Sequence, residues 1–170
     1  MTLSRNKEFN WEGIQVRVSL PSNYDSQQAY PIVLLNDGEL DYLSDLSKSV
    51  ILVGLIPESR LNDFTPWQAR ALKEGVPDFG GKVEAYHEKL FQGILTSLKK
   101  DYLIDENKIA YGGYSLGGLA AVYSLYSSYL PATCIFSICG SFWYPDFTEF
   151  CREHDLIQSQ SLIYLLNGQT

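Results

Sequence analysis

A short segment near the middle of the chain passes from an apolar strand pattern through glycines and a serine into a helical pattern. Residues 109–118 read Ile-Ala-Tyr-Gly-Gly-Tyr-Ser-Leu-Gly-Gly. A serine held in a sharp strand-to-helix turn needs glycine two residues before and two after it, because larger side chains there would collide with neighbouring backbone. Gly113, Ser115 and Gly117 meet this requirement. The segment therefore predicts a strand, a strained turn and a helix, with Ser115 projecting as a candidate nucleophile.

The residues on both sides of this turn favour a nucleophile over a purely structural serine. Residues 108–111 follow a strand pattern, and residues 119–126 are mostly apolar, as in a buried helix. The alternative is a glycine-rich turn in which Ser115 only shapes the backbone, since the bare pattern arises by chance in roughly one chain in twenty. The strand and the helix supply the context that the motif needs.

Length and composition predict one globular domain over residues 1–170. The chain has 45% hydrophobic and 19% charged residues, an ordinary balance for a domain with a buried core. Its net charge of −7 leaves no basic patch to neutralise phosphates. We therefore expect no nucleic-acid partner and no membrane partner.

Neither the cysteines nor the N-terminal residues point to a cofactor or a membrane. The three cysteines have neither the paired spacing of a disulfide framework nor the spacing of a zinc site, so we expect no metal and no other cofactor. Residues 1–10 contain no apolar signal core, and no apolar run approaches the length of a membrane span. These observations predict a cytoplasmic protein.

Strand and helix patterns alternate along the chain, which predicts an α/β fold with a mainly parallel sheet flanked by helices. Residues 14–20 alternate between apolar and polar side chains and should form a half-exposed strand at a sheet edge. The other expected strands are 30–35, 49–56, 108–111, 133–139 and 162–166, and the expected helices are 39–46, 82–100, 119–126 and 146–157.

Several polar or glycine-containing segments come directly after these strands. In a parallel sheet the ligand site lies outside the carboxyl ends of the strands. We therefore expect one crevice to be formed by residues 36–38, the long loop 57–81, Ser115, residues 140–141 and Gly168.

Five segments together carry a family resemblance: 34–38 (Leu-Leu-Asn-Asp-Gly), 60–67 (Arg-Leu-Asn-Asp-Phe-Thr-Pro-Trp), 79–82 (Phe-Gly-Gly-Lys), 112–120 around Ser115, and 141–144 (Ser-Phe-Trp-Tyr). With them the chain resembles the esterases of the α/β-hydrolase family. Within that family it is most similar to the enterochelin (siderophore) esterases, which are related to S-formylglutathione hydrolases and mycolyltransferases. The resemblance covers roughly residues 14–168 and implies the α/β-hydrolase fold.

The resemblance also implies a mechanism and a set of site residues. Ser115 would attack an ester carbonyl and form an acyl-enzyme that water then cleaves. The oxyanion would be held by the backbone N–H groups of Leu116 and Glu39. The residues expected to line the substrate pocket are Arg60, Trp67, Trp143 and Tyr144.

The acid and the histidine that this fold pairs with its serine are not evident in the chain. The family places both after a strand such as 162–166, and the chain stops at Thr170. His87 lies on the expected helix 82–100, where a structural or surface role is expected. His154 lies in a polar helical stretch, Arg152 to Asp155, which does not favour it as the base.

We therefore expect a C-terminally incomplete domain, lacking its last strand and helix. A fragment is favoured over a natural truncation or a site completed by another chain. An uncovered C-terminal sheet edge would then invite self-association.

Three functions follow from these observations. The leading hypothesis is a serine ester hydrolase with a small-molecule ester substrate, a siderophore ester being the specific candidate. A thioesterase or acyltransferase would use the same turn and differ in what attacks the acyl-enzyme. The alternative from another class is a non-catalytic binding module that retains Ser115 without its base, since a serine without a base is a poor nucleophile.

Overall fold

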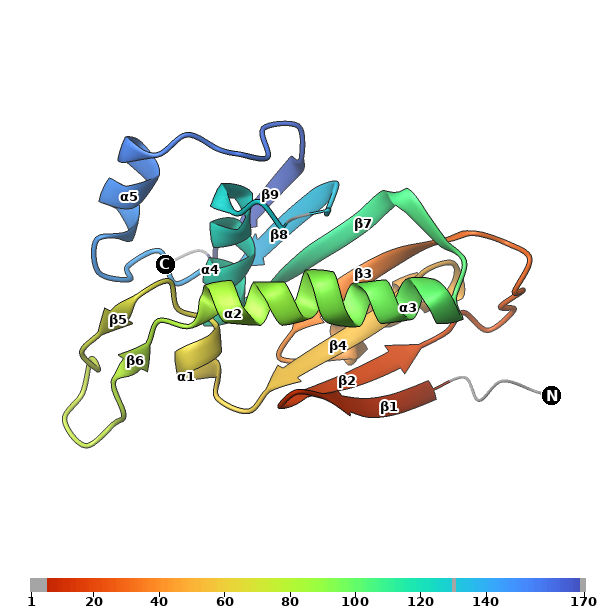
Figure 1. The fold of residues 1–170 in the computed structure, drawn as a ribbon, viewed down its shortest axis with the longest axis horizontal. Helices are drawn as coiled ribbons and strands as arrows, with labels where there is room; N and C mark the ends of the chain where they lie inside the picture. The colour runs from red at the N-terminus through yellow and green to blue at the C-terminus, as the bar shows by residue number, and fades with distance from the viewer. Residues whose placement is uncertain (1–5, 130, 169–170) are drawn as a thin grey trace.

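The computed structural model describes residues 6–129 and 131–168, and its central element is a seven-stranded sheet (Figure 1). The strands lie in the order β1-β2-β4-β3-β7-β8-β9. Strands β4, β3, β7, β8 and β9 run parallel to one another, and the predicted mainly parallel sheet is confirmed. The bounds are β1 Asn6–Trp11, β2 Ile14–Ser19, β3 Tyr30–Asn36, β4 Ile51–Pro57, β7 Ile104–Tyr114, β8 Cys134–Ile138 and β9 Leu162–Leu166.

The prediction that residues 14–20 form an edge strand is wrong. β2 pairs antiparallel with β4 on one side and with β1 on the other, so β1 is the edge. The turn between β1 and β2 consists of Glu12 and Gly13, which have φ of 47° and 89°. Two positive φ values in a two-residue loop are typical of the tight hairpin turns whose twist matches that of the strands. β1 carries apolar side chains only at Phe9 and Trp11, too few for an alternating pattern to be recognised, and its pairing with β2 extends the strand to Asn6.

The helices cover the sheet mainly on one face. α2 (Val83–Glu88), the π-helical η2 (Lys89–Ile94) and α3 (Leu95–Asp101) follow one another without a break across the front of the sheet in Figure 1. This agrees with the predicted helix 82–100. The remaining helical elements are η1 Leu40–Lys48, α1 Arg60–Asp63, α4 Leu116–Tyr123, η3 Ser124–Tyr126 and α5 Phe147–Glu153, the last shorter than the predicted 146–157.

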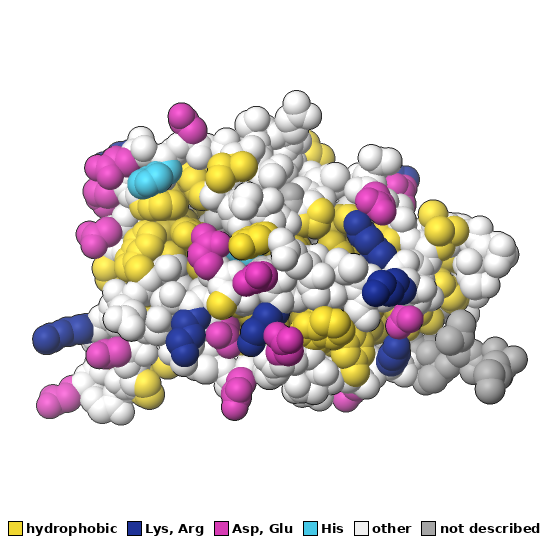
Figure 2. Space-filling model, viewed as in Figure 1, with side chains coloured by type: hydrophobic (Ala, Val, Ile, Leu, Met, Phe, Trp, Pro, Cys, Tyr) yellow, Lys and Arg dark blue, Asp and Glu magenta, His cyan; other side chains and the backbone are white. Residues whose placement is uncertain are grey.

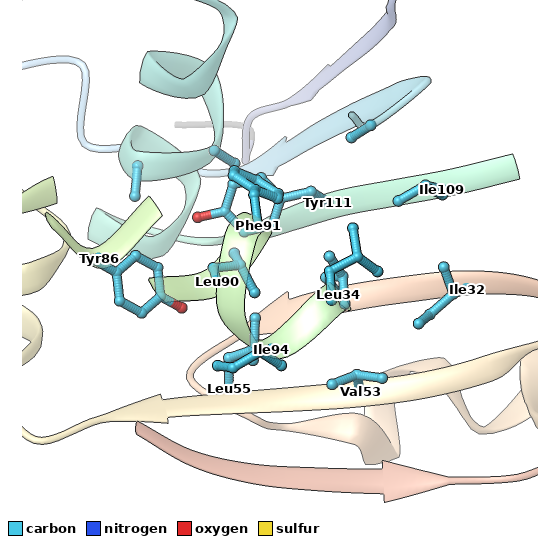
Figure 3. Packing of buried hydrophobic residues seen from close by; sticks show 14 of the residues in the cluster. Ile32, Leu34, Val53, Leu55, Tyr86, Leu90, Phe91, Ile94, Ile109 and Tyr111 are labelled. Carbon is cyan, nitrogen blue, oxygen red and sulfur yellow. The ribbon is translucent and has the colours of Figure 1, made fainter. Parts of the chain in front are cut away.

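The main core lies between this long helix and the strands β4, β3 and β7. Figure 3 shows Leu90 and Ile94 of the helix directed at Leu34 of β3 and Leu55 of β4. These four side chains are fully buried. Full burial of one aliphatic side chain stabilises a fold by about 1.5–3 kcal/mol, so this interface holds the sheet centre and the helix together.

The loop 57–81 has structure of its own. It contains α1 and a small hairpin of β5 (Gln68–Ala69) and β6 (Phe79–Gly80). Gly81 has φ 67°, and a Cβ there would lie 2.2 Å from the carbonyl carbon of Trp67. The backbone N–H of Gly81 donates to Thr65 Oγ1 at 3.0 Å. These contacts fix the two ends of the hairpin, and with them the backbone of the predicted pocket residue Trp67.

The far edge of the sheet is exposed. All five residues of β9 are exposed, with Leu162 at 62% and Leu165 at 54%. α4 packs against β7 and β8, and its cover ends before β9. Figure 2 shows acidic and basic side chains interspersed over the helical face, with apolar side chains gathered near α5 and the β5–β6 hairpin. In the part of the chain that the structure describes, no helix is long and apolar enough to cross a membrane.

Candidate active site

Ser115 lies between β7 and α4 in the strained turn that its neighbours in the sequence predict. β7 ends at Tyr114 and α4 begins at Leu116. Ser115 itself has φ 54° and ψ −119°, a backbone conformation that costs a non-glycine residue of order 1–3 kcal/mol. Its N–H donates to Ile138 O and its carbonyl accepts the Leu119 N–H, each at 3.0 Å, which maintains the turn. A half-buried serine at the carboxyl end of a central strand can act as a nucleophile.

Close packing inside the turn requires both motif glycines. A Cβ on Gly113 would lie 2.7 Å from the carbonyl carbon of Gly117 and 2.9 Å from Cβ of Asn36. A Cβ on Gly117 would lie 2.9 Å from the same Asn36 atom. Carbon atoms in a packed interior do not approach so closely. The glycines are needed because of a side chain from β3 as well as because of the backbone.

Ser141 belongs to the crevice expected from the sequence, but its contact with Ser115 was not predicted. Its side chain is buried, with 1% exposure, and its Oγ lies 3.1 Å from Oγ of Ser115. Its backbone N–H donates to the Ser115 carbonyl at 3.0 Å. Within residues 6–129 and 131–168 this is the one side-chain hydrogen bond of the Ser115 hydroxyl. The available signal was its place just after β8, the strand that pairs with β7.

The two candidate oxyanion donors belong to segments that lie against each other. Leu116 is the first residue of α4, and a first-turn N–H has no partner within its own helix. Glu39 directly precedes η1, and its side chain is exposed. Asn36, three residues before Glu39, donates from Nδ2 to the Gly117 carbonyl at 2.8 Å. The strand end of β3 and the first turn of α4 are thus joined next to Ser115.

Arg60 forms a two-point ion pair at the carboxyl end of β3. Its Nε and Nη2 each donate to a different carboxylate oxygen of Asp37 at 3.0 Å. Asp37 has φ 67°, so its backbone forms the turn while its side chain holds Arg60. Two of the five guanidinium N–H donors point at this carboxylate, and the Arg60 side chain remains 41% exposed. Arg60 can therefore still accept an anionic ligand.

The three predicted aromatic pocket residues form one cluster with different exposures. Tyr144 is buried, its ring lies 6.0 Å from that of Trp67, and its hydroxyl donates to the Trp67 carbonyl at 2.5 Å. Trp67 Nε1 donates to Pro145 O at 3.0 Å. Trp143 is 53% exposed, with its ring 6.2 Å from Phe79. Trp143 can contact a ligand directly, whereas Tyr144 holds the cluster together.

Neither histidine is hydrogen-bonded to Ser115 in the described part of the chain. His154 is exposed, its ring stacks on Phe150 at 4.2 Å, and its Nδ1 lies 2.9 Å from the Phe150 carbonyl. His87 is fully buried, and its Nε2 lies 3.2 Å from the hydroxyl of Tyr111. Desolvation lowers the pKa of His87 to about 3, so the ring is neutral. The structural role expected of His87 agrees with this burial.

The neutral ring of His87 has one nitrogen that donates and one that accepts. Tyr111 is fully buried, and desolvation raises the pKa of its hydroxyl, so it stays protonated and can donate to Nε2. With Tyr111 as the donor, Nδ1 of His87 carries the ring proton, and the backbone of Ala120 is the polar group that partly offsets the desolvation of the ring. Among the described residues no three His, Cys, Asp or Glu side chains gather as a metal site would require.

A family model and one curated protein match most of this chain. The family model described as "Putative esterase" matches residues 7–164. A Bacillus subtilis (strain 168) protein named uncharacterized protein YbbA is 26% identical over 163 residues, which are 88% of this chain and 65% of that protein.

Solved structures share the fold. The IroE-like serine hydrolase from Shewanella oneidensis superposes with a TM-score of 0.81 at 21% identity, over 94% of this chain and 59% of that one. The enterobactin esterase FES from Shigella flexneri, crystallised in the presence of enterobactin, superposes with a TM-score of 0.70 at 16% identity, over 93% of this chain and 44% of that one. The chain thus spans less than two thirds of the length of these proteins.

Proposed function

The chain belongs to the esterase family whose model it matches, and on this premise we propose that it is a serine carboxylic-ester hydrolase with Ser115 as nucleophile. The observation that carries the proposal is the backbone of Ser115, held at φ 54° between β7 and α4. Such strain persists only where the surrounding structure maintains it, and it is typical of active sites. Family membership supports ester hydrolysis, and the strained serine supports the acyl-enzyme route.

In the proposed reaction Ser115 Oγ adds to the ester carbonyl, its proton passes to a base, and the alcohol leaves. Water then cleaves the acyl-enzyme. The N–H of Leu116 and that of Glu39 stabilise the oxyanion, a contribution of about 10² to 10³ in rate for each donor. The base is not assigned to a described residue, because neither histidine is hydrogen-bonded to Ser115: His87 bonds to Tyr111 and His154 to the Phe150 carbonyl.

We further propose a siderophore ester as the substrate class. Enterobactin is the molecule present with the Shigella flexneri esterase, whose fold this chain shares. Arg60 has free donors that suit catecholate or carboxylate oxygens, and the exposed ring of Trp143 suits stacking on an aromatic ring. A thioester or an acyl transfer would use the same serine, and turnover of matched ester and thioester substrates distinguishes these reactions.

The second candidate is a non-catalytic binding module. It is favoured by one observation: within residues 6–129 and 131–168 the Ser115 hydroxyl bonds to Ser141 and to no histidine. Such a module would bind an ester without cleaving it.

Self-association through β9 is also proposed, with a second copy of this chain as the partner. The outer edge of β9 has no neighbouring strand among the described residues, and β9 itself contains no charged residue. Uncharged strand edges readily add a further strand. The cytoplasmic location expected from the sequence stays a prediction.

The test of the nucleophile is labelling with a fluorophosphonate probe, followed by intact mass. We expect one adduct on the wild-type chain and none on Ser115→Ala, with turnover of a simple ester lower by about 10⁶-fold in the variant. Ser124→Ala is the matched control. Ser124 is buried and directly follows α4, and its hydroxyl donates to Ala121 O. A folded wild-type chain that takes no adduct would reject the hydrolase proposal for this chain and favour the binding module.

A further inference from the structure

Asn36, the last residue of β3, has a side chain whose polar atoms are all used. It is 2% exposed. Its Nδ2 donates to the Gly117 carbonyl at 2.8 Å and to the Tyr111 hydroxyl at 2.9 Å. Its Oδ1 accepts the Tyr86 hydroxyl at 2.7 Å. A buried amide with three partners on three different elements has one orientation only.

The three partners come from the elements that surround the turn at Ser115. Tyr86 belongs to α2, Tyr111 to β7 and Gly117 to the first turn of α4. Desolvation raises the pKa of both tyrosine hydroxyls, so both keep their protons and Tyr86 remains a donor. The Gly117 carbonyl can only accept, so the NH₂ group of Asn36 faces α4 and its amide oxygen faces Tyr86.

Packing reinforces these hydrogen bonds. The Asn36 Cβ occupies the space left by both motif glycines, since a Cβ on Gly113 or on Gly117 would lie 2.9 Å from it. The Asn36 side chain thus packs against both Gly113 and Gly117, which flank the turn, and donates to the Gly117 carbonyl.

We propose that Asn36 is the positioning residue of the oxyanion site, fixing the Leu116 N–H on α4 relative to the Glu39 N–H after β3. Leu116 directly precedes Gly117, the residue that Asn36 holds, and Glu39 is three residues beyond Asn36 itself. The inference rests on the proposed ester hydrolysis for its chemical meaning. Its structural content, the relative placement of two backbone amides, can be measured without catalysis.

The test compares Asn36→Asp with the wild-type chain in two measurements. The aspartate keeps the shape of asparagine, but its ionised carboxylate cannot donate to the Gly117 carbonyl. Burial raises the pKa of a carboxyl group at this position, so the two chains are compared from neutral to high pH, where the aspartate ionises. We expect the backbone amide resonances of Leu116 and Glu39 to shift. We expect the rate of fluorophosphonate labelling at Ser115 to fall about 10²-fold, the loss typical of one displaced oxyanion donor. The ratio of variant to wild-type rates should rise as the pH falls, because a protonated carboxyl group can donate again.

Thr133→Val is the matched control, because it removes a cross-link at the opposite end of the same strands. Thr133 Oγ1 accepts the N–H of Ile109 at 3.2 Å. This variant should leave both amide resonances and the labelling rate unchanged. If Asn36→Asp does not fold, Tyr86→Phe removes only the donor to the amide oxygen and should slow labelling roughly tenfold.

Each outcome decides the inference. Unmoved amide resonances in a folded Asn36 or Tyr86 variant overturn it, and so does unchanged labelling when the resonances move. If the wild-type chain does not label at all, the proposed hydrolysis fails, and the amide comparison still decides whether Asn36 positions these two groups.

Discussion

β3 and β9 are uncharged strands of the same parallel sheet, and their side chains have opposite environments. In β3 six of the seven residues are buried, whereas in β9 all five are exposed. β3 lies between β4 and β7 with the long helix α2–η2–α3 packed against it. β9 pairs with β8 alone among the described strands, beyond the cover of α4. An apolar sequence thus predicts a strand in both cases, whereas the elements packed against the strand determine whether its side chains are buried.

The largest expected effect is a difference in stability between matched leucines of the two strands. Leu34→Ala in β3 removes a side chain with no exposed surface and should lower the free energy of unfolding by about 2–5 kcal/mol. Leu165→Ala in β9 should change it by less than about 0.5 kcal/mol, because that side chain is 54% exposed. Urea unfolding at a concentration where the chain is monomeric measures both. Equal losses would mean that β9 is covered in solution.

The second effect is a pH dependence of the free energy of unfolding that arises from buried His87. His87 has a folded-state pKa of about 3, below the ordinary 6.5 of the unfolded chain. Below pH 6.5 the unfolded chain binds a proton that the folded chain does not, so stability is lost as the pH falls. The slope approaches about 1.4 kcal/mol per pH unit, or roughly 2 kcal/mol by pH 5.

His87→Gln should remove this slope from the pH dependence of urea unfolding. The matched control is His154→Gln, at an exposed ring, which should leave the slope in place. The assignment of a neutral, buried His87 is contradicted if the stability of His87→Gln depends on pH as steeply as that of the wild-type chain.

The smallest effect on stability belongs to the edge. Leu165→Lys in β9 should alter the free energy of unfolding by less than about 0.5 kcal/mol, since the side chain already lies in solvent. It should nevertheless reduce self-association, because a charge on an edge strand disfavours pairing with another strand. Light scattering after gel filtration gives the mass of each species. A wild-type chain that is monomeric at high concentration argues against the β9 interface.

Local patterns predicted much of the fold. The strand 162–166 coincides with β9, and the helix 82–100 agrees closely with Val83–Asp101, because both depend on periodicity within one segment. The sequence did not predict β1, because this strand depends on its pairing with β2 and not on a pattern within its own six residues.

The site was less accessible to such patterns. The motif around Ser115 is local and was identified, whereas Asn36 meets Tyr111 and Gly117 across 75 and 81 residues of sequence. Ser141 reaches Ser115 across 26 residues. Such side-chain contacts form only once the strands have paired, so the spacing of these residues in the sequence does not predict them.

The packing of Asn36 between Gly113 and Gly117 has an evolutionary consequence. Each of the three positions limits what the other two can accept, since any side chain added to a glycine would overlap the asparagine. Because the contacting atom of Asn36 is its Cβ, every residue except glycine at position 36 leaves the same close contact, and a side chain on Gly113 would in addition lie 2.7 Å from the Gly117 carbonyl carbon. Both glycines should therefore be retained in descendant sequences whatever side chain stands at position 36, whereas Asn36 itself is constrained by its hydrogen bonds to Gly117, Tyr111 and Tyr86.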